Sequence, residues 1–180
     1  TRADEARIEA SIAKIAPAIN ERRFSRAASD FRGEAPHLKP PAARRLAAAR
    51  TFRLEAASRS IALLVGTVRK GDATIELELE FPRKGKKLAR AVEVDVKGRR
   101  FTFEHSPYIR SMNIDEFEAT QLLGFFDSIA LSTSQRLDLA CLAYELKQPM
   151  KGAQLLQEVG SLDPSLRKEV EDMIALSREQ

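Results

Sequence analysis

Two histidines, one cysteine and scattered carboxylates are the side chains of this 180-residue chain that could support acid–base or metal chemistry. Glu104, His105 and Tyr108 bring a carboxylate, an imidazole and a phenol together, which makes His105 the candidate for general acid or base work. In a strand, His105 shares the inward parity of Phe101 and Phe103, at the rim of the core. No nucleophile or oxyanion donor accompanies it, so we expect no enzyme and no catalytic residue.

Metal and thiol chemistry find little support. Glu76, Glu78 and Glu80 share one face of a strand, but hard-cation sites gather their oxygens from a turning loop. Cys141 lies on an apolar helix face, where we expect an inert core thiol. The glycines form no phosphate-binding loop, and no G-x-S-x-G, H-E-x-x-H or C-x-x-C motif occurs. We therefore expect no metal and no cofactor.

Arginines mark the predicted long helix at residues 41–70. The candidates for binding an anion or a partner there are Arg44, Arg45, Arg50, Arg53 and Arg59. They could form a track for nucleic acid or another anionic ligand, since each neutralised phosphate adds salt-dependent affinity. The interpretation we favour is a solvated helix face, or arginine stems that pack over the acidic strands.

Two short basic stretches, residues 83–87 and 97–100, fall in successive turns of a predicted β-meander. Successive hairpin turns lie at opposite ends of a sheet, so the two stretches should not merge into one surface. Neither stretch has the interleaved aromatic residues that single-strand binding uses. The sequence predicts two separate solvated turns.

The net charge of +4 and the pI near 9.4 conceal an uneven distribution. Residues 1–71 hold 15 Lys and Arg against 7 Asp and Glu, whereas residues 106–180 hold 7 against 12. Such a chain is a dipole, so its pI is a poor guide to what one face attracts. No apolar run approaches the roughly 20 residues of a membrane span, and the start at Thr1 suggests a segment of a larger protein.

Helical periodicity dominates the first 70 residues. Isoleucines at helical spacing predict a first helix that kinks at Pro17 or ends near Asn20, and a second helix stops at Gly33. The long helix follows from a seven-residue repeat, whose members are Ala47, Leu54, Ile61 and Val68, with Ala57 and Leu64 in the second seam position.

An antiparallel meander of three or four strands follows. Alternation at residues 75–81 indicates a half-buried strand. A second strand places Val92, Val94 and Val96 on one face, and residues 97–98 turn into a third strand. A short fourth strand is expected at residues 108–112. A sheet of this size needs helices on its apolar face.

The last third is predicted to be helical again. Asn113 and Glu116 have capping-box spacing ahead of an apolar stripe at residues 114–129. Residues 132–134 offer caps for a central apolar helix, and Pro149 opens the next helix, which ends near Gly160. A last helix is expected from Pro164, with Leu166, Val170 and Ile174 as its apolar residues.

Residues 137–164 resemble a tetratricopeptide-type helical hairpin. Its packing residues are Leu137, Ala140 and Tyr144 on the first helix, Ala153, Leu156 and Val159 on the second, and Pro164 at the close. The family's usual tryptophan and first-helix glycine are absent. The order of helices, meander and helices is also similar to uncharacterised regions of large bacterial multidomain proteins. The tetratricopeptide resemblance implies contact between proteins and no chemistry.

These observations predict an α+β fold with helical hairpins at both ends and a long helix packed on the meander. The expected segments are basic helices at 1–71, the meander at 72–112 and tetratricopeptide-like hairpins at 113–180. The expected function is non-enzymatic: an interaction or scaffolding module that contacts another protein or another domain of its parent chain. The alternative is nucleic-acid or anionic-ligand binding through the arginine-rich helices.

Overall fold

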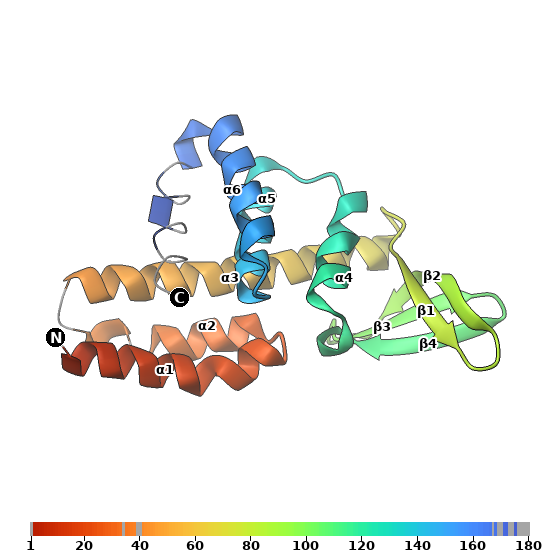
Figure 1. The fold of residues 1–180 in the computed structure, drawn as a ribbon, viewed down its shortest axis with the longest axis horizontal. Helices are drawn as coiled ribbons and strands as arrows, with labels where there is room; N and C mark the ends of the chain where they lie inside the picture. Colours follow the sequence, from red (N-terminus) through yellow and green to blue (C-terminus); the bar gives the residue numbers. More distant parts are fainter. Residues whose placement is uncertain are drawn as a thin grey trace. The chain divides into compact units, whose positions relative to one another are not determined.

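The computed structural model describes residues 2–33, 35–38 and 41–166, together with residues 168, 171, 172 and 175. In these residues, six α-helices and a four-stranded antiparallel sheet confirm the predicted α+β class (Figure 1). The chain forms two compact units: a helical unit, Thr1–Ser60 with Leu131–Gln180, and a sheet unit, Ile61–Ala130. The long helix α3 (Pro41–Lys70) contributes residues to both units.

The helical unit contains two helical hairpins and the first part of α3. Helices α1 (Arg2–Asn20) and α2 (Phe24–Arg32) form the first hairpin and run alongside α3, and α1 ends where the sequence predicts (Figure 1). Helices α5 (Thr133–Glu145) and α6 (Pro149–Leu162) form the second hairpin. Short 3-10 turns occupy Ala35–His37 and Pro164–Leu166. Val170 and Ile174 of the predicted last helix lie outside the described residues.

The start of α5 is as predicted, but one packing residue of the second hairpin differs. Ser132 caps α5 by accepting a hydrogen bond from the backbone N–H of Gln135, whose side chain completes a capping box. The small residue against the Tyr144 ring is Gly152, because a Cβ built there would lie 2.7 Å from Tyr144 Cε2. Ala153, which the tetratricopeptide resemblance counts among the packing residues of this hairpin, is exposed.

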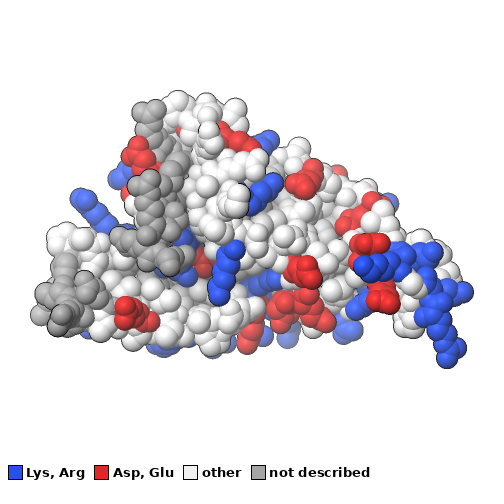
Figure 2. Space-filling view, viewed as in Figure 1, with Lys and Arg blue, Asp and Glu red and all other residues white. Residues whose placement is uncertain are grey.

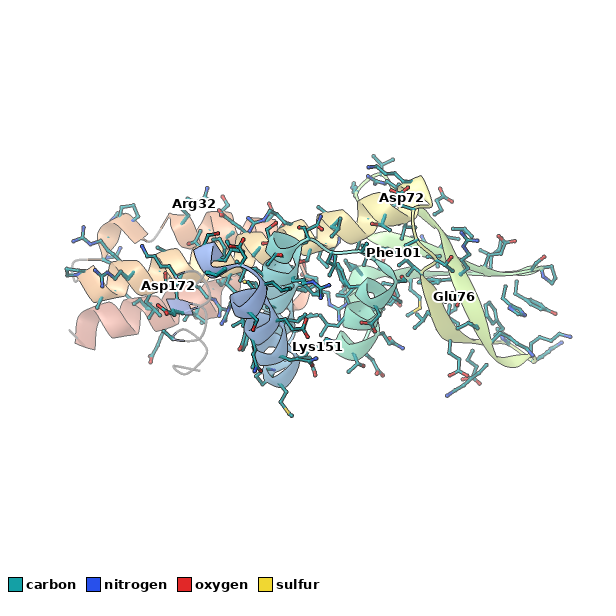
Figure 3. The ribbon with its side chains drawn as sticks, turned by 90° about the horizontal axis from the view of Figure 1, so that it is seen from above. Arg32, Asp72, Glu76, Phe101, Lys151 and Asp172 are labelled. Atoms are coloured by element: carbon teal, nitrogen blue, oxygen red, sulfur yellow. The ribbon has the colours of Figure 1, made fainter. Side chains whose placement is uncertain are left out.

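The sheet has the order β1 (Glu76–Phe81), β2 (Gly85–Val94), β3 (Arg100–His105) and β4 (Tyr108–Asn113). Its inner face carries alternate apolar residues and is covered by an aromatic cluster. Phe117 packs edge-on against Phe101 and Phe103, with ring centroids 5.5 and 5.8 Å away. Phe101 lies between the sheet and α4 (Ala119–Gly124) (Figure 3).

The inner face of β2 differs from the prediction. A β-bulge between Ala91 and Glu93 adds one residue to β2, so the alternation shifts at this point. Ala91 and Val94 are buried, whereas Val92 is 47% exposed and Val96, beyond the strand, is 96% exposed. The prediction that Val92, Val94 and Val96 share the inner face was therefore wrong for two of the three residues.

Residues 114–128 form two 3-10 turns and the short helix α4 instead of one helix. The predicted capping box at Asn113 and Glu116 is present, but it opens a 3-10 turn, Ile114–Glu116. Phe117 is extended, and a second capping box from Glu118 to Gln121 then starts α4. A further 3-10 turn covers Phe125–Ser128. This interruption turns the rings of the apolar stripe toward the sheet.

The β2–β3 turn is organised by the carboxylate of Asp95. Its Oδ1 atom accepts hydrogen bonds from the backbone N–H groups of Arg99, at 2.6 Å, and Arg100, at 3.0 Å. Gly98 supplies the left-handed φ of +67° that the turn requires. The bonds from Arg100 and then Arg99 lower the pKa of Asp95 below its ordinary value of 3.8, because they favour the ionised form.

We expect Asp95→Asn to be less stable than the wild type near neutral pH. The folded pKa is depressed, so the contribution of the ionised carboxylate is present above 3.8 and is lost as the pH falls through the lower folded value. Urea midpoints measured near neutral pH and well below 3.8 should therefore differ between the two proteins only in the first condition. A difference that persists in strong acid would contradict this role for Asp95.

Candidate functional site

Two of the predicted arginines meet a carboxylate inside the helical unit. Arg53 Nε donates to Glu145 Oε1 at 2.5 Å, and Arg50 Nη2 donates to Glu145 Oε2 at 3.2 Å. Both arginines lie on α3 and Glu145 ends α5, 92 and 95 residues away along the chain. Arg53 is 1% exposed, and Arg50 and Glu145 are each 7% exposed. We call these three residues the buried charge cluster.

The buried charge cluster holds two guanidinium groups and one carboxylate, so it carries one excess positive charge. Burial lowers the pKa of Arg50; Glu145 opposes this shift and Arg53 adds to it. The Nε and Nη1 atoms of Arg50 and the Nη1 atom of Arg53 have no hydrogen-bond partner. The guanidinium of Arg53 also lies 5.8 Å from the centroid of the Tyr144 ring. Arginine stays protonated in proteins, so this cluster can fix one helix against another but cannot relay a proton.

Arg59 forms the second ionic link between α3 and α5. Its Nε and Nη2 atoms donate to the two oxygens of Asp138 at 2.9 and 2.6 Å, a bidentate arrangement. This hydrogen bonding raises the pKa of Arg59. Cys141, on the same helix, is fully buried, and burial raises the pKa of its thiol, as expected for a core residue. The α5 face toward α3 therefore carries ionic partners.

The five candidate arginines do not share one surface. Arg44 and Arg45 are exposed near the start of α3, whereas Arg50, Arg53 and Arg59 bind carboxylates of α5. The heptad repeat of the long helix contains a signal for the burial of Arg50. Arg50 stands seven residues before Ala57, in the same seam position of the heptad repeat, and that position predicts burial. Glu145 has no comparable signal, because its partners lie far away in sequence.

His105 ends β3, and the phenol of the predicted group is close to it, because Tyr108 on β4 is its cross-strand partner. Its Nδ1 atom is 2.9 Å from the carbonyl oxygen of Leu88, and its ring lies against that of Phe81. Glu104, the carboxylate beside it in sequence, belongs to the opposite face of the strand. Within the described residues, no three His, Cys, Asp or Glu side chains are grouped so that they could hold a metal ion.

Comparisons with known proteins leave the site to be interpreted from its geometry. No protein-family model matches the chain, and neither the curated proteins nor the solved structures yield a match. Among the described helices, none combines the length and the apolar character that crossing a membrane requires.

Proposed function

We propose that this chain is a non-enzymatic protein–protein interaction or scaffolding module of a larger protein. The observation that supports this proposal is the outer face of the sheet, which exposes aliphatic side chains between pairs of opposite charge. Leu88, Val92 and Ile109 are 56%, 47% and 67% exposed. Protein interfaces combine such apolar contacts with a polar rim, and the partner would be another protein or another domain of the parent chain.

Three carboxylates on this face stand opposite a cation on a neighbouring strand. Arg90 stands between Glu76 on β1 and Glu104 on β3, and Lys86 stands opposite Glu80. Cross-strand pairs of opposite charge stabilise a sheet, so these three carboxylates need no arginine helix above them. A face with paired charges and exposed aliphatic groups suits a protein surface better than it suits a polyanion or a hard cation.

The pairing of the α3 arginines disfavours the alternative, anion binding through the N-terminal helices. Arg50, Arg53 and Arg59 each bind a carboxylate of α5, so of the five candidates only Arg44 and Arg45 are exposed and stand outside these ion pairs. Two neighbouring cations provide a weak electrostatic surface at physiological salt. The arginines of α3 are better explained as the groups that hold the tetratricopeptide-like second hairpin in place.

Site-specific photo-crosslinking in cells that express the full-length protein tests the proposal. A photo-reactive amino acid at position 88 or 109 should give discrete adducts, and Arg90→Glu should reduce them by breaking the charge pairs beside both positions. The matched control is position 96, because Val96 is also an exposed aliphatic residue but lies in the turn beyond β2. Adducts as diffuse from positions 88 and 109 as from position 96 would refute the interaction surface.

A further inference from the structure

One end of the sheet carries the turns of two hairpins, β1–β2 and β3–β4. In a four-stranded meander the β1–β2 and β3–β4 turns lie at the same end, and the β2–β3 turn lies at the other (Figure 1). The basic stretch at 83–87 therefore lies at the same end of the sheet as residues 105–108. The second basic stretch, at 97–100, lies at the other end. The aromatic residues missing from the basic turn come from the neighbouring hairpin.

The curl of the sheet brings these two hairpins into contact. Arg110 Nη1 on β4 donates to the carbonyl oxygen of Glu80 on β1 at 2.8 Å, although these strands are at opposite edges of the sheet order. The Phe81 ring lies 5.8 Å from that of Tyr108 and 6.4 Å from that of His105. Phe81 is buried, while His105 and Tyr108 are half-buried, so part of each of these two residues stays accessible.

Strand alternation separates the charges at this end. Lys87 is paired with Leu79 and Arg110 with Phe103, and both apolar partners are buried on the inner face. Lys87 and Arg110 are therefore inner-face cations. The strand carboxylates of the same hairpins belong to the outer face: Glu76, Glu78, Glu80 and Glu104. The inner face at this end thus combines cations and rings without a carboxylate from β1 to β4 near them.

The β1–β2 turn adds further cations. Arg83 and Lys84 are exposed within it, and Arg83 adopts a positive φ of 62°. Figure 2 shows Lys and Arg side chains gathered over this tip of the sheet unit. We call Arg83, Lys84, Lys87, Tyr108 and Arg110 the basic end of the sheet.

We propose that the basic end binds single-stranded nucleic acid. Its Lys and Arg side chains would contact successive backbone phosphates, and an unpaired base would stack on the accessible part of Tyr108, next to His105. Stacking requires bases that are not already paired, which favours a single strand over a duplex. Residues 82–87 contain no large apolar side chain that could insert into a bilayer, which makes an anionic membrane the weaker candidate.

Fluorescence anisotropy with a labelled oligouridine, over a series of salt concentrations, measures this binding. Four basic side chains on four phosphates should give a slope of log affinity against log salt of about −3 for a single strand. The paired variant Lys84→Ala with Lys87→Ala removes two contacts, so it should weaken binding about tenfold or more at low salt and make the slope less steep by about 1.4.

Two further variants separate stacking from charge. Tyr108→Ala should weaken binding about fivefold or more with an unchanged salt slope, because it removes a stacking surface and no charge. Tyr108→Phe keeps the ring and should bind as the wild type does. This rescue shows that a loss in Tyr108→Ala comes from the missing ring surface, and circular dichroism checks that each variant is folded.

The matched control lies at the other end of the same sheet. Lys97→Ala with Arg100→Ala removes the same charge from the β2–β3 turn and should leave the affinity unchanged. Equal losses from the two paired variants would overturn the proposal, since they would indicate attraction to net charge alone. No binding at low salt would also overturn it, as would binding to phosphatidylserine vesicles without binding to the oligonucleotide.

Discussion

Replacing Glu145 with alanine should lower the free energy of unfolding by about 3 to 5 kcal/mol, because two buried guanidinium groups lose the one carboxylate that pairs with them in the described part of the chain. Arg53 and Arg50 are 1% and 7% exposed, so solvent cannot replace the missing partner without opening the contact between α3 and α5. Three of their nitrogen atoms already lack a hydrogen-bond partner, so few other hydrogen bonds compensate for the loss of Glu145. Urea unfolding followed by far-ultraviolet circular dichroism measures the effect.

Two comparisons identify the cause of that loss. Removing all three charges, in the triple variant Arg50→Met, Arg53→Met and Glu145→Leu, should leave the stability unchanged or raise it by about 1 to 4 kcal/mol. Arg136→Ala breaks a half-exposed pair with Glu158 and should cost less than about 1 kcal/mol. A triple variant as unstable as Glu145→Ala would show that packing, and not unpaired charge, dominates at this position.

Two glycine substitutions in α6 should have opposite effects. A Cβ at Gly152 would lie 2.7 Å from Tyr144 Cε2, so Gly152→Ala must displace a ring that is 8% exposed and should cost about 1 to 3 kcal/mol. At Gly160 a Cβ meets nothing within 4 Å. Gly160→Ala should therefore stabilise the helix by up to about 1 kcal/mol.

Thermal unfolding of the two alanine variants beside the wild type tests this pair. Both changes add one methyl group to the same helix, so helix propensity cancels in the comparison between them. The difference between their midpoints then reports the contact with Tyr144. Stabilisation by Gly152→Ala would mean that the Tyr144 ring moves aside at little cost.

Features that depend on neighbours in sequence were predictable. The long helix followed from its heptad repeat, the capping box at Asn113 from a spacing of three residues, and the cap at Ser132 from the hydroxyl residues at 132–134. Each is stabilised within a few turns of backbone, so a short window of residues contains its cause. For the same reason the end of α1 at Asn20 could be placed without knowledge of the rest of the chain.

The remaining features depend on partners far away in sequence. Glu145 pairs with arginines more than 90 residues earlier, and no local pattern joins them. The sequence gives no sign of the bulge at Val92, because apolar residues keep alternating with a period of two from Val92 to Val96. The basic end requires both the order of the strands and the curl of the sheet. The sequence shows the cations at 83–87 and the rings of His105 and Tyr108, but it does not show that they are close in space.

At the bulge in β2, the structure depends on having a residue at position 92 but not on the type of its side chain. Val92 is half-exposed and faces solvent, so many side chains should be acceptable there. Deleting the residue would keep Ala91 and Val94 on the inner face, since one residue between them suffices for alternation. What deletion would remove is the added twist that a bulge gives to a strand. Sequences related to this one should therefore vary freely in residue type at this point while keeping the length of the strand.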